Sequence, residues 1–340
     1  MGVNLTPYDD KPGFYENPRE WWGKLNLYDI IRLRTSIIFS NKRLSVKSMD
    51  EKIAEAILEA AASTKPVYSE VYFRKPPKPR PIIDTQLKPV GIQGEVEKIS
   101  ITENPKVPRR VDQLIQERIP ARDAVIELYI SGLDVYYIQR IFSAAGLGVR
   151  KKFVPTRWTI TAVDKIISQH IFRRVKHYKE YPTYEIYHTS YIGNRYTIFI
   201  IPGTWSIEMI EVWLPHSVWV PGSKPYIYTV HELEDGKPND EDGGYYAIRL
   251  SVLEFLDKQK RQAKVIVVRE ITPEYFAPVG SWQIRESIRN AFKQRPEKPG
   301  SLEEALAILA RKTILSLEEI VKNSKLLDIV QRQKMITEFF

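Results

Sequence analysis

The stretch from Tyr184 to Ile201, YEIYHTSYIGNRYTIFII, decides the fold of this chain. Apolar and polar side chains follow a period of two in both halves, which is the pattern of a β-strand with one buried face. Gly193 and Asn194 stand between the halves, and such a pair favours a tight turn. The sequence therefore predicts a β-hairpin with its turn at residues 193–194.

Three more strands are expected after the hairpin. The segments SIEMIEVWL (206–214), KPYIYTV (224–230) and AKVIVVREI (263–271) have strand patterns, and the last is typical of a buried strand. Helical spacing covers about 247–259 and 282–294. Consecutive strands followed by mixed units predict an α+β fold, with an antiparallel or mixed β-sheet and packed helices.

The end of the chain is expected to be helical and then flexible. Ser301 with Glu304, and Ser316 with Glu319, have the spacing of capping boxes. We therefore expect two C-terminal helices followed by a flexible C-terminal tail.

The first third of the chain is expected to mix helices with extended backbone. Ser48 and Glu51 have capping-box spacing and open a helix to about Ser63. The stretch KPVYSEVYF (65–73) alternates like a strand, and KPPKPRP (75–81) is too rich in Pro for a helix. A rigid extended connector is the first interpretation, and a ligand for a proline-binding module is the second. Helices are expected at 111–116 and 121–131.

Five parts follow from these patterns. They are an N-terminal segment with helices (1–64), a Pro-rich extended segment (65–110), a main α+β domain (111–295), C-terminal helices (296–332) and the tail (333–340).

Composition excludes several classes of protein. Hydrophobic residues make up 43% and charged residues 27% of the 340, values that are typical of a folded globular protein. There is no secretory signal pattern and no apolar run of membrane-spanning length, so we expect a cytoplasmic protein with no membrane contact. Because there are no cysteines, disulfides, thiol catalysis and cysteine-ligated zinc are excluded.

Positive charge is concentrated between Arg150 and Lys179. Nine Lys and Arg residues lie there with one acid, Asp164, while the whole chain has a net charge of +9. Thr161 with Asp164 is expected to cap a helix whose apolar face runs to Val175. Cations near the start of a helix suit phosphate oxygens, and Phe153 and Trp158 could stack on bases. The candidate DNA-binding residues are Arg150, Lys151, Lys152, Arg157, Trp158, Arg173 and Arg174. The alternative is a solvated helix face with Trp158 in the core.

The last eight residues, QKMITEFF, form a second candidate binding site. Gln333, Ile336, Phe339 and Phe340 are spaced so that one tight turn places the aliphatic side chain and both rings on one side. These residues resemble the box that binds the sliding clamp PCNA. The alternative is a tail folded onto its own core.

Several long motifs together resemble one family. KKFVPTRWTITAVD, EVWLPHSVWVPGSKP, RQAKVIVVREITPEYFAPVGSWQIRES and the terminal QKMITEFF are similar to the archaeal DNA repair family NreA, over roughly residues 65–340. The resemblance implies a role in repairing damaged DNA, with recruitment through PCNA. Members with an N-terminal cysteine cluster suited to zinc differ from this chain, which has no cysteine.

Catalysis is left open by the sequence. Carboxylates that hold Mg²⁺ or Mn²⁺ commonly hydrolyse phosphodiesters, and the candidates here are Asp164, His188, Glu208 and Glu211. On an ideal strand Glu208 and Glu211 point to opposite faces, so at most one would join a cluster. Each carboxylate is otherwise a helix cap or an ion-pair partner. Arg285 and Glu286 form either part of a pocket or a surface pair.

Two hypotheses follow. The first is a clamp-tethered, DNA-binding repair factor with a metal-dependent nuclease or phosphoesterase activity. The second is a non-catalytic adaptor that binds nucleic acid and brings other repair factors to PCNA.

Overall fold

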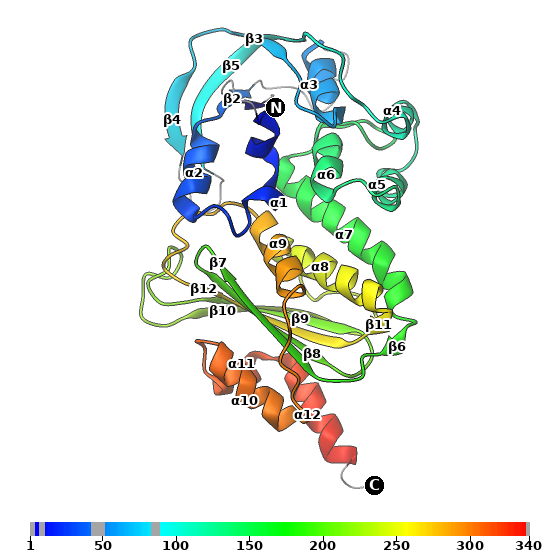
Figure 1. Cartoon of the computed structure of the whole chain (residues 1–340), viewed down its shortest axis with the longest axis vertical. Helices are drawn as coiled ribbons and strands as arrows, with labels where there is room; N and C mark the ends of the chain where they lie inside the picture. The colour runs from blue at the N-terminus through cyan, green and yellow to red at the C-terminus, as the bar shows by residue number, and fades with distance from the viewer. Residues whose placement is uncertain (1–3, 7–10, 42–51, 83–88, 338–340) are drawn as a thin grey trace. The chain divides into compact units, whose positions relative to one another are not determined.

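The computed structural model describes residues 4–6, 11–41, 52–82 and 89–337, and its contacts divide the chain into two compact units (Figure 1). The first unit comprises residues 1–167 and the second residues 168–340. The boundary lies inside helix α7 (Thr156–Val175), within the segment 111–295 that we expected to form one domain.

The first unit holds a five-stranded sheet beside short helices. Its strands are β1 (Asn4–Leu5), β2 (Ile38–Asn41), β3 (Ser69–Phe73), β4 (Lys78–Ile82) and β5 (Val90–Ile101). Its helices are the 3₁₀ turn η1 (Pro12–Glu16), α1 (Pro18–Trp21), α2 (Leu27–Thr35), α3 (Lys52–Ala62), α4 (Arg109–Gln116), α5 (Ala121–Ile130), α6 (Val135–Ser143) and the start of α7.

Strand β5 organises this sheet and was not expected. It pairs in parallel with β2 and antiparallel with both β3 and β4. Part of the Pro-rich segment (65–110) forms β4, in which Lys78 is paired with Gln93. Pro is tolerated there because β4 is an edge strand.

Helix α3 buries its apolar face against β5. Ile53, Ile57, Val96 and Ile99 pack into one cluster with Phe153, which follows α6 in the chain. The helix expected to end near Ser63 is therefore present, while Ser48 and Glu51 of its expected capping box lie outside the described residues.

The second unit is built on a mixed five-stranded sheet, as the α+β expectation requires. Its strands are β7 (Glu185–Tyr191), β8 (Asn194–Ile201), β9 (Ser206–Trp213), β10 (Tyr226–Glu232) and β12 (Lys264–Ile271), in the order β10-β9-β12-β8-β7. A separate pair is formed by β6 (Lys179–Glu180) and β11 (Arg261–Gln262). Strand β12 runs parallel to β9 and antiparallel to β8, and all eight of its residues are buried.

The expected hairpin is present, with its turn one residue earlier than predicted. Ile192 and Gly193 form the turn with φ of 44° and 73°, and Asn194 already begins β8. Two positive φ values in succession are the signature of a type I′ turn, whose twist matches that of the flanking strands. The Asn194 amide donates to the carbonyl of Ile192 and holds the turn closed.

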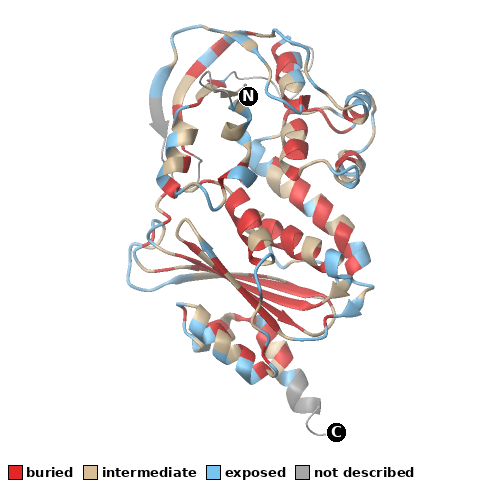
Figure 2. Ribbon diagram, in the orientation of Figure 1, coloured by how far each residue is buried: buried red, intermediate tan, exposed pale blue. Residues whose placement is uncertain are grey.

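Helices cover both faces of the second sheet (Figures 1 and 2). One face carries α8 (Gly243–Gln259) and α9 (Trp282–Ala291). The other carries α10 (Leu302–Lys312), α11 (Leu317–Asn323) and α12 (Lys325–Thr337). Ser301 and Ser316 cap α10 and α11 as predicted, each accepting from a backbone N–H at 3.2 Å. A third helix, α12, follows them and was not expected.

Among the described residues, none of the helices has both the length and the apolar character that a bilayer span requires.

Candidate nucleic-acid interface

The basic stretch begins in a loop and continues along α7. The helix starts at Thr156, directly after Pro155, whose carbonyl accepts from Thr159 N at 3.0 Å. The expected cap at Thr161 is therefore wrong, because Thr161 lies inside the helix and donates to the carbonyl of Arg157 at 3.4 Å. Pro155 has a fixed φ and no N–H to lose, which suits the entry to a helix.

Three cations at this end of the stretch have no acid beside them among the residues that the structure describes. Arg150 and Arg157 are exposed and Lys152 is half-buried. Within the described part of the chain, no carboxylate lies within ion-pair distance of any of the three. Trp158 is 62% exposed on the first turn of α7, so its ring is not part of the core. We call Arg150, Lys152, Arg157 and Trp158 the basic corner.

Phe153 and Lys151 have structural roles instead. Phe153 is buried in the α3 cluster, so its ring is not available for stacking on a base. The Lys151 ammonium donates to the carbonyls of Leu114 at 3.2 Å and Gly146 at 3.0 Å, and burial lowers its pKa. Lys151 thus fixes the path of the loop, where its own φ is 41°.

At the C-terminal end of α7, which belongs to the second unit, the two arginines differ in their surroundings. Arg173 is exposed. Arg174 donates to Asp257 at 2.9 Å and contacts His170 at 2.8 Å, and the hydrogen bond that Arg174 donates to the Asp257 carboxylate raises the pKa of Arg174. Burial alone would raise the pKa of Asp257, but hydrogen bonds from Arg174 and Tyr178 bring it down to about 2. Arg174 is therefore neutralised by an acid of its own unit.

Asp164, the first catalytic candidate, is fully buried in the first unit. Its carboxylate accepts from Gln139 Nε2 on α6 at 3.1 Å, so it takes part in the packing of α7 against α6.

Glu208 caps helix α12. The carboxylate is fully buried on β9 and accepts from Lys325 N at 2.7 Å, from Leu326 N at 3.2 Å and from the hydroxyl of Ser324. Burial raises its pKa, and these hydrogen bonds oppose the rise. The carboxylate satisfies N–H groups that the first turn of a helix leaves without partners.

Glu211 faces the opposite side of β9, as its spacing from Glu208 predicts. It forms an ion pair with Arg269 on β12 at 2.5 Å and accepts from Trp213 Nε1 at 2.9 Å. Arg269 also donates to the side chain of Asn194, at 2.8 and 3.1 Å. Side-chain contacts of Arg269 thus link β12 to β8 through Asn194 and to β9 through Glu211.

His188 lies on β7, three strand positions away from β9. The register runs from His188 through Thr197 and Val268 to Ile210, so about 14 Å separate the two strands. Burial first, then the charge of Arg195, lowers the pKa of His188 to about 4. Its Nδ1 lies 3.0 Å from the hydroxyl of Thr197. His188 and Glu208 are too far apart to share one ion, and no group of three potential metal ligands is present in the ranges described.

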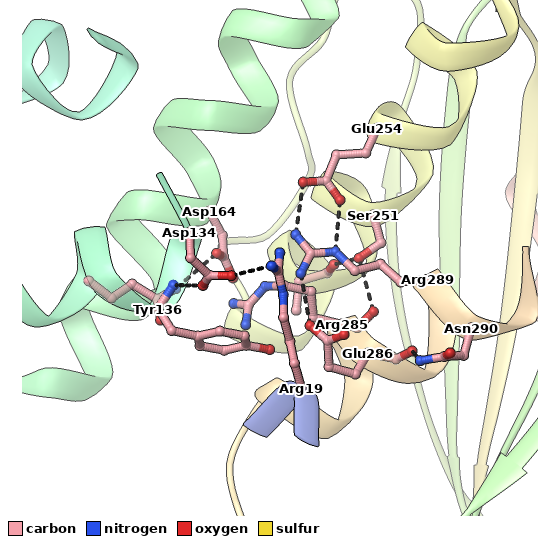
Figure 3. A network of polar contacts seen from close by, with 12 residues as sticks. Arg19, Asp134, Tyr136, Asp164, Ser251, Glu254, Arg285, Glu286, Arg289 and Asn290 are labelled. Atoms are coloured by element: carbon pink, nitrogen blue, oxygen red, sulfur yellow. Dashed lines mark hydrogen bonds and ion pairs between the residues drawn. The ribbon is translucent and has the colours of Figure 1, made fainter. Parts of the chain in front are cut away.

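Two further polar networks in the second unit, one buried and one partly buried, were not predicted. Arg249 on α8 donates to Glu232 on β10 at 2.6 and 2.8 Å, and Glu232 also accepts from Tyr245 and Trp205. Arg289 on α9 pairs with Glu254 on α8 and with Glu286, each at 2.8 Å (Figure 3). Arg285 and Glu286 are thus buried residues of the α8–α9 packing, and not a surface pair.

Figure 3 also draws a smaller contact that belongs to the first unit. Asp134 accepts from Tyr136 N at 2.7 Å, which caps α6, and pairs with Arg19 at 2.5 Å. Asp134 is the local sequence signal for α6, a helix that was not predicted.

The candidate clamp-binding residues are only partly described. The backbone of Gln333 and Ile336 belongs to α12, which continues through Thr337, so the first half of the expected tail is helical. Phe339 and Phe340 lie outside the described residues.

Comparison with known proteins gives a consistent family. Residues 1–220 match the sequence family described as archaeal Nre, N-terminal, and residues 232–339 match archaeal Nre, C-terminal. DNA repair protein NreA of Archaeoglobus fulgidus is 34% identical, over 100% of this chain and 84% of that protein. DNA repair protein NreA of Haloferax volcanii is 35% identical over 85% of this chain and 73% of that protein. DNA repair protein NreB of Archaeoglobus fulgidus is 31% identical over 98% and 85%, respectively. No solved structure matches the chain.

Proposed function

This chain belongs to the archaeal Nre family, and from that premise we propose that it is a DNA repair factor that binds DNA and is recruited by the sliding clamp PCNA. The names of its relatives, DNA repair proteins NreA and NreB, support the repair role. The DNA-binding part of the proposal is carried by one observation, the basic corner.

The basic corner has the two kinds of group that DNA binding uses. Arg150, Lys152 and Arg157 have no acid to neutralise them within the described residues, so they are available to phosphate oxygens. The exposed ring of Trp158 offers a face on which a base can stack. The cations of this stretch that serve packing have partners in the protein instead, as Arg174 has in Asp257 and Lys151 has in two backbone carbonyls.

Recruitment rests on the C-terminal spacing. An aliphatic side chain and two rings presented by one turn suit a hydrophobic pocket, and each buried side chain contributes about 1.5 to 3 kcal/mol before the cost of ordering. Gln333 and Ile336 are carried by the last turns of α12, which supports a turn-shaped ligand.

The adaptor form of this role is favoured over the nuclease form. Glu208 and Glu211 are engaged in capping and in an ion pair on opposite faces of β9. Incubation of labelled flap, fork and single-stranded DNA with Mg²⁺ or Mn²⁺ tests the nuclease form. Cleavage that disappears in Asp164→Asn, with DNA binding retained, would overturn the adaptor form.

One experiment tests both binding activities by separating them. In the full-length protein, Arg150→Ala and Arg157→Ala are each expected to lower the slope of log affinity for duplex DNA against log salt by about 0.9, the loss of one phosphate contact. PCNA binding should be unchanged in both. Deletion of residues 337–340 should abolish PCNA binding and leave the DNA salt slope intact.

The matched control is Arg311→Ala, an exposed arginine on α10 that pairs with Glu297. It should leave both binding activities unchanged. Unchanged salt slopes in the Arg150 and Arg157 variants would refute the DNA-binding surface. Clamp binding that survives the deletion, or a deletion that unfolds the protein, would refute the clamp site.

A further inference from the structure

A shallow hollow of about 260 Å³, broadly open to solvent, lies in the first unit and is lined in part by the basic corner. Its walls are mainly apolar, and Arg150, Lys151 and Lys152 lie along it. The apolar lining comes from the start of α5, the end of α6 and the loop between α6 and α7, namely Pro120, Ala121, Phe142, Leu147, Val149 and Val154.

The shape of the hollow is set by the loop. Gly148 has φ of 97°, and a Cβ built there would lie 3.2 Å from the Cβ of Ala121. Only glycine suits both this backbone conformation and this close approach. Lys151 then anchors the loop through the two carbonyls to which it donates. The hollow is therefore defined by fixed backbone.

Its size and chemistry favour a flat apolar ring with charge beside it. Pockets for larger organic ligands occupy about 300 to 1,000 Å³, so this one is suited to a single ring system. Val149 is 52% exposed, which leaves apolar surface facing the solvent beside Arg150. A free anion would gain nothing from contact with the apolar walls, and an uncharged ring would gain nothing from the charges of the cations. A nucleotide has both parts.

We propose that this hollow receives one unstacked base of DNA, while Arg150 and Lys152 hold the neighbouring phosphates. The inference rests on the proposed DNA binding and adds that the preferred substrate contains an unpaired nucleotide. Extruding a base from an intact duplex costs a few kcal/mol, whereas a bulged or mismatched base is largely released from that cost. The hollow thereby distinguishes damaged from intact DNA.

A larger hollow, of about 430 Å³, is less suited to this role. Lys11, Lys24 and Glu20 all line it, so its charge is of both signs. Of these two hollows in the described part of the chain, the smaller one combines apolar walls with cations and no acid.

The test uses two 20-base-pair duplexes that differ at one position. One carries a single bulged adenine, and the other carries a bulged abasic residue in the same place. The wild-type protein is expected to bind the bulged adenine about tenfold more tightly, since contacts to one base commonly account for such a factor. Fluorescence anisotropy at fixed salt measures both dissociation constants.

Val149→Asn changes the wall of the hollow without changing charge and should abolish the preference for the base. Ile130→Asn is the matched control, because Ile130 is a 66% exposed apolar residue of the same unit that does not line the hollow. It should keep the tenfold preference. Arg150→Ala should weaken binding of both duplexes by a similar factor.

The outcomes separate the two proposals. If wild type binds both duplexes equally, or Val149→Asn keeps the preference, the hollow is not a base site although DNA binding stands. If wild type binds neither duplex with salt-dependent affinity, the proposed DNA binding itself fails.

Discussion

The sheet of the second unit and the basic corner of the first unit use arginine side chains in opposite ways. In the second unit the arginines around the sheet are buried and matched, with Arg249 on Glu232 and Arg269 on Glu211. In the basic corner of the first unit, Arg150 and Arg157 are exposed and have no acid at ion-pair distance among the described residues. An arginine paired with a buried acid helps to specify packing, while an exposed arginine without such a pair is available to bind a ligand. The comparison separates structural from functional cations more clearly than net charge does.

The buried pair of Arg249 and Glu232 should give the largest effect on stability. Arg249→Met leaves the carboxylate of Glu232 buried without its cation, which costs about 3 to 5 kcal/mol in the free energy of unfolding. Urea unfolding followed by tryptophan fluorescence measures the loss. Arg174→Ala breaks a more exposed pair and should cost less than about 1 kcal/mol. Equal losses in the two variants would break the comparison, because burial would then not decide the role of a charge.

Glu208→Ala should have the next largest effect, and its effect should be local. The substitution removes the acceptor of two N–H groups at the start of α12, one buried and one partly buried, and should lower the free energy of unfolding by about 2 to 3 kcal/mol. Hydrogen exchange should show lost protection in α12 before the central strands. Glu318→Ala, an exposed acid on α11, is the control and should leave the exchange pattern unchanged. Full protection of α12 in Glu208→Ala would mean that the cap is not needed.

His188 should give the smallest effect, and it depends on pH. Because its pKa is about 4 when folded and about 6.5 when unfolded, the unfolded state binds more protons between these values. Stability contributed by neutral His188 is present above pH 6.5 and lost as the pH falls toward 4. In His188→Gln, the loss in the free energy of unfolding between pH 6.5 and pH 4 should be smaller by about 1 kcal/mol than in the wild type, after allowance for partial contact with solvent.

Urea midpoints measured at pH 7, 5.5 and 4.5 follow this decline. His177→Gln, at an exposed histidine outside the sheet, is the control and should keep the wild-type pH dependence. A wild-type pH profile in His188→Gln would remove His188 from the set of buried groups that stabilise the sheet.

Local patterns predicted much of the second unit. The alternation of apolar and polar residues predicted β7 to β10, and the apolar run predicted β12. Ser301 and Ser316 predicted the starts of two helices. The hairpin turn was misplaced by one residue because Ile192, a β-branched residue, takes a positive φ. The conformational preference of a β-branched residue disfavours a positive φ, and the pairing of β7 with β8 imposes it.

Features that depend on distant residues were not predictable. Helix α12 is capped by Glu208, which precedes Lys325 by 117 positions, so the partner is not a neighbour in sequence. Strand β5 contains glycines, which weaken a strand signal, and its pairing with three other strands stabilises it. The candidate DNA-binding residues were recognised as a group, but only the fold distinguishes Lys151 and Arg174, which serve packing, from Arg150 and Arg157.

The capped start of α12 also bears on how a bound partner would be oriented. One end of this helix is fixed in the sheet by Glu208, and the other continues through Thr337 toward the chain terminus. A partner bound at the described end of α12 would thus hold a helix whose other end is fixed to the sheet. Rotation of that partner would be transmitted to the sheet of the second unit. Attachment would therefore constrain the orientation of the partner relative to this sheet as well as its distance from it.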